Sequence, residues 1–143
     1  MKLSANLGLL WSELPLLERV YKAKEKNFDA VEFQFPYEVD ANELKKAIDK
    51  INLPIIGINT IKGNVSKGDN GLNAVPSRVQ EARSAIDQAI EYAKVIGSKN
   101  IHFMCGITEQ NHNSLKTLVE NLQYAVSQLN DTNIGLVLSL IHI

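Results

Sequence analysis

Large apolar and polar side chains alternate between residues 30 and 35 of the chain. The apolar positions are Val31, Phe33 and Phe35. Glu32 and Gln34 lie between them, which is the two-residue period of a β-strand. Pro36 has no N–H to donate to a neighbouring strand, so it ends the pattern. One face of this predicted strand is therefore apolar, and the other carries a carboxylate and an amide.

Strand-like and helix-like segments alternate along the rest of the chain. Besides 30–35, the pattern predicts strands at residues 3–8, 55–59, 100–104 and 134–138. Apolar positions at the 3.6-residue period predict helices over residues 15–26, 44–51, 79–97 and 115–129. Two capping boxes mark helix starts, and they pair Asp40 with Glu43 and Ser77 with Gln80. The expected order is four β/α units followed by a fifth strand.

One long irregular segment, residues 60–75, separates the third strand from the third helix. Residues 63–68 have the glycine spacing of a phosphate-binding loop. Asp69 stands where that motif requires a lysine that reaches the phosphates. We therefore expect a lid over the strand ends rather than a nucleotide site.

Strict β/α alternation predicts parallel strands joined by helical crossovers. Four polar residues lie near the carboxyl ends of successive predicted strands, on the face opposite the large apolar residues: Asn6, Glu32, Asn59 and His102. An open sheet has helices on both faces and apolar strands, whereas inward polar residues at strand ends form the active-site rim of a barrel. A complete (β/α)8 barrel needs roughly 250 residues. The sequence therefore predicts an α/β fold, the truncated first half of a (β/α)8 TIM barrel, over residues 1–137.

Composition narrows the setting of the protein. Fifteen basic and sixteen acidic residues give a net charge of −1, without a block of like charge that would bind nucleic acid. Cys105 is the single cysteine and excludes an internal disulfide. The N-terminal residues are too polar for a signal-peptide core, and no apolar run approaches the length of a membrane span. We expect a cytoplasmic protein with no nucleic-acid or membrane partner.

Four stretches carry a resemblance to a known family: residues 4–7, residues 28–37 (Phe-Asp-Ala-Val-Glu-Phe-Gln-Phe-Pro-Tyr), residues 63–71 with Pro76, and residues 101–106. In this order they resemble the hydroxypyruvate isomerase family, a member of the xylose-isomerase-like barrels. The resemblance implies interconversion of hydroxypyruvate and tartronate semialdehyde by proton transfer through an enediolate. A similar branch of the family isomerises 2-oxo-tetronates.

The resemblance also implies catalytic residues that this chain lacks. The family's base pair is one glutamate on the fifth strand and one on the eighth, and further metal-binding side chains come from the sixth and seventh. Ser139 occupies the place of the first glutamate. Residues 138–143, Leu-Ser-Leu-Ile-His-Ile, match the translation of a transposon end used in sequencing libraries, and we expect a non-native tail there. The chain as given is expected to be inactive, and a divalent metal, Mg²⁺ or Mn²⁺, is expected only in the complete protein.

The site hypothesis therefore concerns substrate binding, with Glu32 and His102 as the main candidates. The alternative is a structural role inside the barrel, as a paired carboxylate for Glu32 and as a hydrogen-bonded imidazole for His102. Asn6 and Asn59 can bind substrate oxygens, although tying strand ends together is the more common role of such residues. No second His or Cys stands at ligand spacing from His102, so the sequence predicts no metal site. The expected partner is a small hydroxy-oxo acid, and association into a homo-oligomer is also expected.

Two other classes of protein compete with an isomerase. An apurinic endonuclease on the same barrel would carry a zinc-binding His before Pro-Gly on the fourth strand, where this chain has Met104 and Cys105 before Gly106. A non-catalytic sugar-acid binding module would share the polar rim and lack the bases. A glutamate followed by proline on the fifth strand of the complete gene would favour the isomerase.

Overall fold

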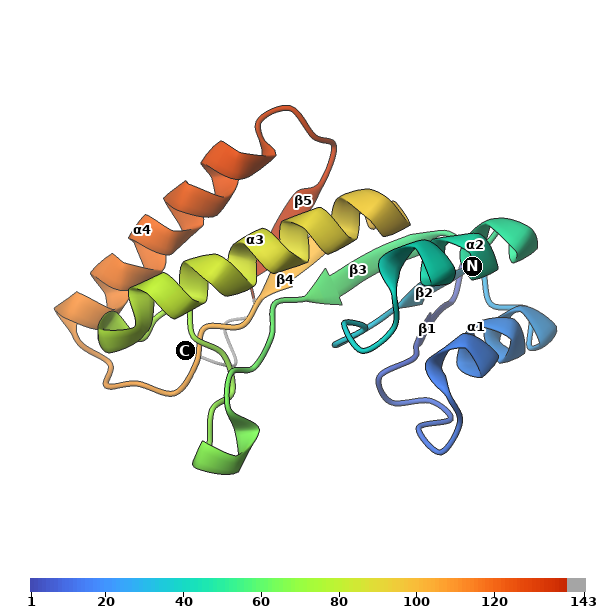
Figure 1. Cartoon of the computed structure of the whole chain (residues 1–143), viewed down its shortest axis with the longest axis horizontal. Helices are drawn as coiled ribbons and strands as arrows, with labels where there is room; N and C mark the ends of the chain where they lie inside the picture. The colour runs from blue at the N-terminus through green and yellow to red at the C-terminus, as the bar shows by residue number, and fades with distance from the viewer. Residues whose placement is uncertain (139–143) are drawn as a thin grey trace.

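The computed structural model describes residues 1–138. Its sheet contains five parallel strands in sequence order, shown in Figure 1. The strands are β1 (Ser4–Asn6), β2 (Ala30–Glu32), β3 (Ile55–Asn59), β4 (Asn100–Phe103) and β5 (Gly135–Leu138). The helices are α1 (Leu16–Glu25), α2 (Ala41–Ile51), α3 (Val79–Ile96) and α4 (His112–Leu129). Two 3₁₀ turns, η1 (Val65–Lys67) and η2 (Pro76–Arg78), interrupt the connection between β3 and α3.

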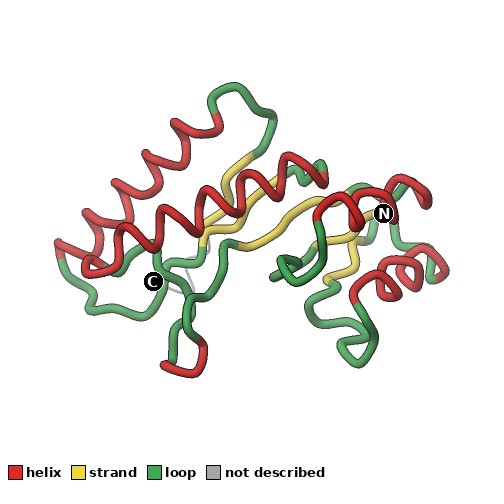
Figure 2. Tube along the Cα trace, viewed as in Figure 1, coloured by secondary structure: helices red, strands yellow, loops and turns green. Residues whose placement is uncertain are grey.

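The four helices lie on one face of the sheet, as Figures 1 and 2 show, and each packs against the next. Right-handed crossovers between adjacent parallel strands place successive helices on the same side. The core between the helices and the sheet is formed by aliphatic residues, with Val20, Leu44, Ile58, Ile86 and Ile101 fully buried. This arrangement is the first half of a (β/α)8 barrel and confirms the predicted fold class.

The second strand is shorter than predicted. It ends at Glu32, because the register between β2 and β3 shifts between Val31 and Glu32. Phe33 is still buried, at 2% exposure. Phe35 lies beyond the strand and is only half-buried. The predicted strand is therefore correct for residues 30–32. The expected burial of Phe35 on the apolar face is wrong.

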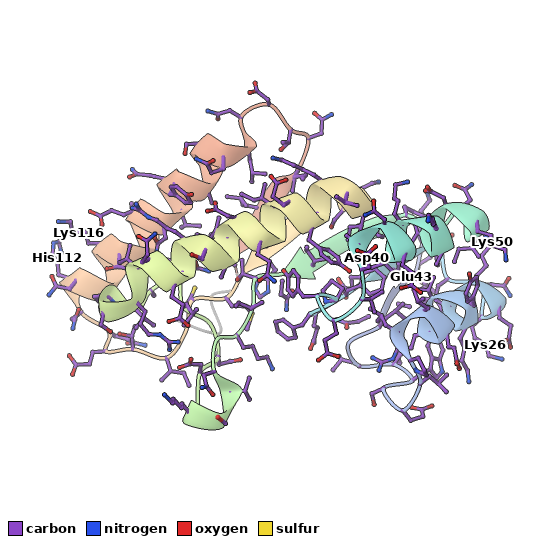
Figure 3. All side chains as sticks on the ribbon, in the orientation of Figure 1. Lys26, Asp40, Glu43, Lys50, His112 and Lys116 are labelled. Carbon is purple, nitrogen blue, oxygen red and sulfur yellow. The ribbon has the colours of Figure 1, made fainter. Side chains whose placement is uncertain are left out.

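The structure contains one of the two predicted side-chain caps at helix starts and lacks the other. Asp40 Oδ1 accepts hydrogen bonds from the backbone N–H groups of Asn42 (3.0 Å) and Glu43 (3.1 Å) at the start of α2, where Figure 3 labels Asp40 and Glu43. The box at Ser77 is wrong, because Ser77 lies inside η2 and no side chain caps α3. Asn111, which the sequence did not single out, caps α4 by accepting from the backbone N–H of Ser114 (3.0 Å).

The apolar stripe of α4 faces in two directions. Leu118, Ala125 and Leu129 are buried against the rest of the chain. Three further apolar residues of this helix are exposed: Leu115 (60%), Val119 (44%) and Val126 (53%). The outer side of α4 therefore presents an apolar surface that no described residue covers.

Among residues 1–138, no helix is long and apolar enough to cross a membrane.

Candidate functional site

The predicted rim residues lie in two pairs across neighbouring strands. Asn6 on β1 is in register with Glu32 on β2. Asn59 on β3 is in register with His102 on β4. All four side chains are half-buried and share one face, because residues opposite each other in a parallel ladder point to the same side of the sheet. The structure thus brings together all four residues named from the sequence.

These residues line an open hollow of about 620 Å³ on the face of the sheet that the helices leave uncovered. Its other polar lining residues are Gln34, Lys62, Asn70 and Asn100, and its apolar ones include Phe33, Phe35, Met104 and Val137. Small-molecule sites commonly combine an apolar lining with a few convergent polar groups. The hollow therefore has the character of a binding site for a small polar molecule.

The charges in this hollow come from two side chains of the described chain. Glu32 supplies the carboxylate among the lining residues, and Lys62 supplies the basic side chain. Lys62 is half-buried, with its ammonium nitrogen 5.0 Å from the ring centroid of Phe35. Sequence reasoning did not find Lys62, because it follows β3 in an irregular segment where no periodicity shows which way a side chain points.

A buried polar network holds the ends of β3 and β4 together. Thr60 Oγ1 accepts a hydrogen bond from the Met104 backbone N–H (3.0 Å). The Asn73 side-chain amide donates to the Met104 carbonyl (3.0 Å), and the Asn121 amide donates to the Asn73 carbonyl (2.9 Å). Thr60, Asn73 and Asn121 are almost fully buried. Buried polar groups need such partners, so the network fixes the rim of the hollow and ties it to α4.

The segment between β3 and η2 projects from the body of the chain (Figure 1) and is braced internally. Asp69 Oδ2 accepts from the Asn64 backbone N–H (2.6 Å) and pairs with the Arg78 guanidinium (2.6 Å). Arg78 also pairs with Glu81 at the start of α3. The hydrogen bond from Arg78, with that from Asn64, lowers the pKa of the Asp69 carboxyl. The lid function stays a prediction, and this ion pair is the contact that its movement would break.

Two tyrosines support the rim from the side of β2. The Tyr37 hydroxyl donates to the backbone carbonyl of Asn59, and the Tyr92 hydroxyl donates to the carbonyls of Pro36 (2.9 Å) and Val39 (2.8 Å). The two rings meet edge to face at 5.2 Å. Burial raises the pKa of Tyr37 above its usual range, and burial followed by the charge of Asp40 raises the pKa of Tyr92 to about 12.

Trp11 and Cys105 lie outside the hollow. Trp11 packs edge to face on Phe28, with ring centroids 6.2 Å apart, and contacts the core. Cys105 is fully buried, and this burial raises the pKa of its thiol. A buried thiol of raised pKa is a poor nucleophile, so Cys105 has a structural role.

The donor set of the hollow does not by itself fit a divalent metal. Glu32 and His102 are its carboxylate and imidazole, and residues 1–138 contain no cluster of three His, Cys, Asp or Glu side chains able to hold a metal ion. Catalytic metal sites usually take at least three protein ligands. We therefore derive no chemical step through a metal from these residues.

Comparison with known proteins places the chain in a family. The model of the xylose isomerase-like TIM barrel matches residues 20–141. The chain is 37% identical to a hydroxypyruvate isomerase of Escherichia coli over 132 residues, which cover 90% of the chain and 51% of that protein. It is 36% identical to a 2-oxo-tetronate isomerase of Haemophilus influenzae over 127 residues, which cover 87% of the chain and 49% of that protein. The chain spans about half the length of the curated relatives it matches.

A solved structure supports the same assignment. The crystal structure described as an AP endonuclease, family 2, from Brucella melitensis superposes with a TM-score of 0.89 at 34% identity. The match covers 96% of the chain and 55% of that structure. The fold and the hollow together define the class of this protein. It is a parallel half-barrel with a polar hollow at its strand ends. The chain belongs to the xylose isomerase-like TIM barrel family.

Proposed function

We propose that this chain forms the N-terminal half, residues 1–137, of an isomerase of small hydroxy-oxo acids. The reaction is the interconversion of hydroxypyruvate and tartronate semialdehyde by proton transfer through an enediolate. The 143-residue chain itself is inactive in this proposal, because the bases of the reaction belong to the remainder of the barrel. Ser139 and the rest of the proposed non-native tail after Leu138 lie outside the described residues.

One observation carries the proposal: four polar side chains from four consecutive strands converge on one hollow at the strand ends. In barrel enzymes this edge is where substrate binds and reacts. With a volume of about 620 Å³, the hollow has room for a small hydroxy-oxo acid, and its polar groups come from different strands. The isomerase names of relatives at 36% and 37% identity support the reaction class.

Each rim residue has a part in the proposed binding. The amides of Asn6 and Asn59 donate hydrogen bonds to hydroxyl and carbonyl oxygens of the substrate. Glu32 accepts from a substrate hydroxyl, and His102 contributes an imidazole beside the reacting carbons. Donors of this kind favour the enediolate over the ketone where negative charge develops on oxygen in the transition state. A positioned base from the rest of the barrel adds roughly 10²–10⁴-fold.

Three alternatives to this function remain. The H. influenzae relative is named a 2-oxo-tetronate isomerase, so a longer hydroxy-oxo acid is the runner-up substrate. The B. melitensis structure carries an endonuclease title, and an apurinic endonuclease is therefore the second class. The charge balance of the chain disfavours the second class, because phosphate contacts on DNA call for a basic surface. A non-catalytic sugar-acid binding module is a third class, with the same ligand and no turnover.

The test is an assay of the complete protein, expressed from the full gene, against three substrates in parallel. These are hydroxypyruvate, a 2-oxo-tetronate and duplex DNA with an abasic site. Isomerisation of hydroxypyruvate with the highest kcat/KM supports the proposal, and preference for the tetronate moves it to the runner-up. Cleavage of the DNA alone, or binding of a hydroxy-oxo acid without turnover, overturns it.

A further inference from the structure

We propose that Lys62 is the residue that binds the substrate carboxylate and thereby selects acids over neutral hydroxy-ketones. The inference rests on the proposed function for the identity of the substrate. Lys62 lies three residues after the end of β3 and lines the same hollow as Asn6, Glu32 and His102.

The position of the Lys62 ammonium suits a substrate anion. Its nitrogen lies 5.0 Å from the ring centroid of Phe35, another lining residue of the hollow. An aromatic face attracts an ammonium group and leaves its N–H donors available to a ligand. Within residues 1–138, no carboxylate lies within 4.0 Å of this nitrogen. The cation is therefore placed at the hollow without an ion pair that a ligand would have to displace.

The backbone of Lys62 is fixed more firmly than its place in a loop suggests. Its carbonyl accepts a hydrogen bond from the Gly71 N–H (2.8 Å), and Gly71 forms a β-bridge with Cys105, two residues after the end of β4. Gly71 has φ +117°, and a Cβ there would lie 2.4 Å from the Met104 carbonyl oxygen. This close approach requires glycine. It anchors the base of the 62–71 loop to β4, so the Lys62 side chain reaches the hollow from a defined point.

Charge explains why the hollow needs this lysine. A hydroxy-oxo acid is an anion at neutral pH, and Glu32 is a carboxylate that lines the same space. Like charges in a partly desolvated site repel each other, and a neighbouring cation offsets the repulsion. The amide side chains in the hollow are neutral and suit the hydroxyl and carbonyl groups. Lys62 is thus the described lining residue whose chemistry matches the carboxylate.

The experiment compares Lys62→Met with Lys67→Met in the complete protein. Methionine is an unbranched side chain one atom shorter than lysine and carries no charge. Lys67 lies at the exposed tip of the same loop. Hydroxypyruvate is the charged ligand. Dihydroxyacetone, in which a neutral hydroxymethyl group replaces the carboxylate, is the matched inhibitor. Lys62→Arg tests rescue by another cation, and circular dichroism checks that each variant is folded.

We expect Lys62→Met to raise KM for hydroxypyruvate about 10- to 100-fold, as for loss of a hydrogen bond to a charged group, with kcat within about twofold. Inhibition by dihydroxyacetone stays unchanged, Lys62→Arg recovers part of the loss, and Lys67→Met behaves as wild type. Equal KM values for Lys62→Met and Lys67→Met overturn the inference and leave the proposed function intact.

A direct binding measurement separates the two proposals. If the wild-type protein does not turn over hydroxypyruvate, the proposed function fails, and titration calorimetry with hydroxypyruvate then judges Lys62. Binding that Lys62→Met weakens and Lys67→Met does not supports the inference. Equal binding by both variants, or no binding by the wild type, overturns it.

Discussion

The Tyr37 hydroxyl donates a hydrogen bond to the backbone carbonyl of Asn59 and so fastens the segment after β2 to the end of β3. The Tyr37 ring in turn packs on Tyr92, whose hydroxyl donates to two carbonyls of the β2–α2 connection. Both phenols must be protonated to donate. The carboxyl end of β3, where Asn59 faces the hollow, is therefore held by groups that titrate in the alkaline range.

Tyr92→Phe is expected to make the free energy of unfolding depend less on pH in the alkaline range. The folded-state pKa of Tyr92, about 12, lies above the unfolded value of about 10. Its stabilising effect is complete below about pH 10 and is lost as pH rises towards the folded pKa. Urea unfolding at about pH 9 and about pH 11 should show a larger loss of unfolding free energy in wild type than in Tyr92→Phe. Tyr21→Phe, at an exposed position of α1, is the control, and equal losses in all three proteins contradict this role.

Asp69→Asn is expected to loosen the loop that carries Lys62. The lowered pKa of Asp69 means that its contribution is complete above the unfolded value near 3.8 and is lost as pH falls through the lower folded pKa. Pepsin should therefore cut the wild-type loop readily only at the acid end of its working range, and cut Asp69→Asn across the whole range. Asp49→Asn, which breaks an exposed pair with Lys45 on α2, is the control. Identical cleavage of wild type and Asp69→Asn would show that the ion pair does not brace the loop.

Glu32→Gln and His102→Ala are each expected to impair the complete enzyme. Both side chains line the hollow. In the proposed function they act there on substrate by charge or hydrogen bonding. We expect kcat/KM for hydroxypyruvate to fall about 10- to 100-fold in each, the cost of one lost contact to a charged or polar ligand. Glu38→Gln and His112→Ala are matched exposed controls, and Figure 3 labels His112 at the N-terminal end of α4. Folded variants with wild-type kcat/KM would leave Glu32 and His102 with a purely structural role.

The chain of 143 residues is expected not to catalyse isomerisation. Its described residues line the candidate hollow, and the pair of bases that the family resemblance implies is absent from them. Purified chain incubated with hydroxypyruvate should form no more tartronate semialdehyde than a preparation from cells with empty vector. Turnover above that background would mean that residues within this half perform the proton transfer.

The same chain is expected to associate in solution. β1 and β5 form the two edges of the described sheet, and Leu115, Val119 and Val126 expose an apolar surface on α4. Such edges and surfaces favour contact between copies. Size exclusion should show dimers or larger species, and thermal unfolding followed by circular dichroism should be poorly cooperative.

Val126→Lys tests which surface drives this association. It should shift the chain towards monomer, whereas Val95→Lys on α3 should not. A wild-type monomer with a sharp thermal transition would show that this half is self-sufficient, and the proposal of a truncated barrel would have to be given up.

The sequence by itself determined the order of the elements and the composition of the polar rim. Periods of two and 3.6 residues state which side chains share a face, and strict β/α alternation requires parallel strands. Asn6, Glu32, Asn59 and His102 therefore could be assigned to one face before any coordinates. The register in the structure places Asn6 beside Glu32 and Asn59 beside His102.

Only the tertiary structure decided what the irregular segments contribute. Lys62 reaches the hollow because Gly71 binds the Lys62 carbonyl and approaches β4, a contact between residues far apart along the chain. Asn121 on α4 supports the same rim through Asn73, across 48 positions of sequence. Local periodicity carries no information on such long-range contacts, because they depend on how separate elements pack. The strand ends could be read from the chain, and the loops that complete the site could not.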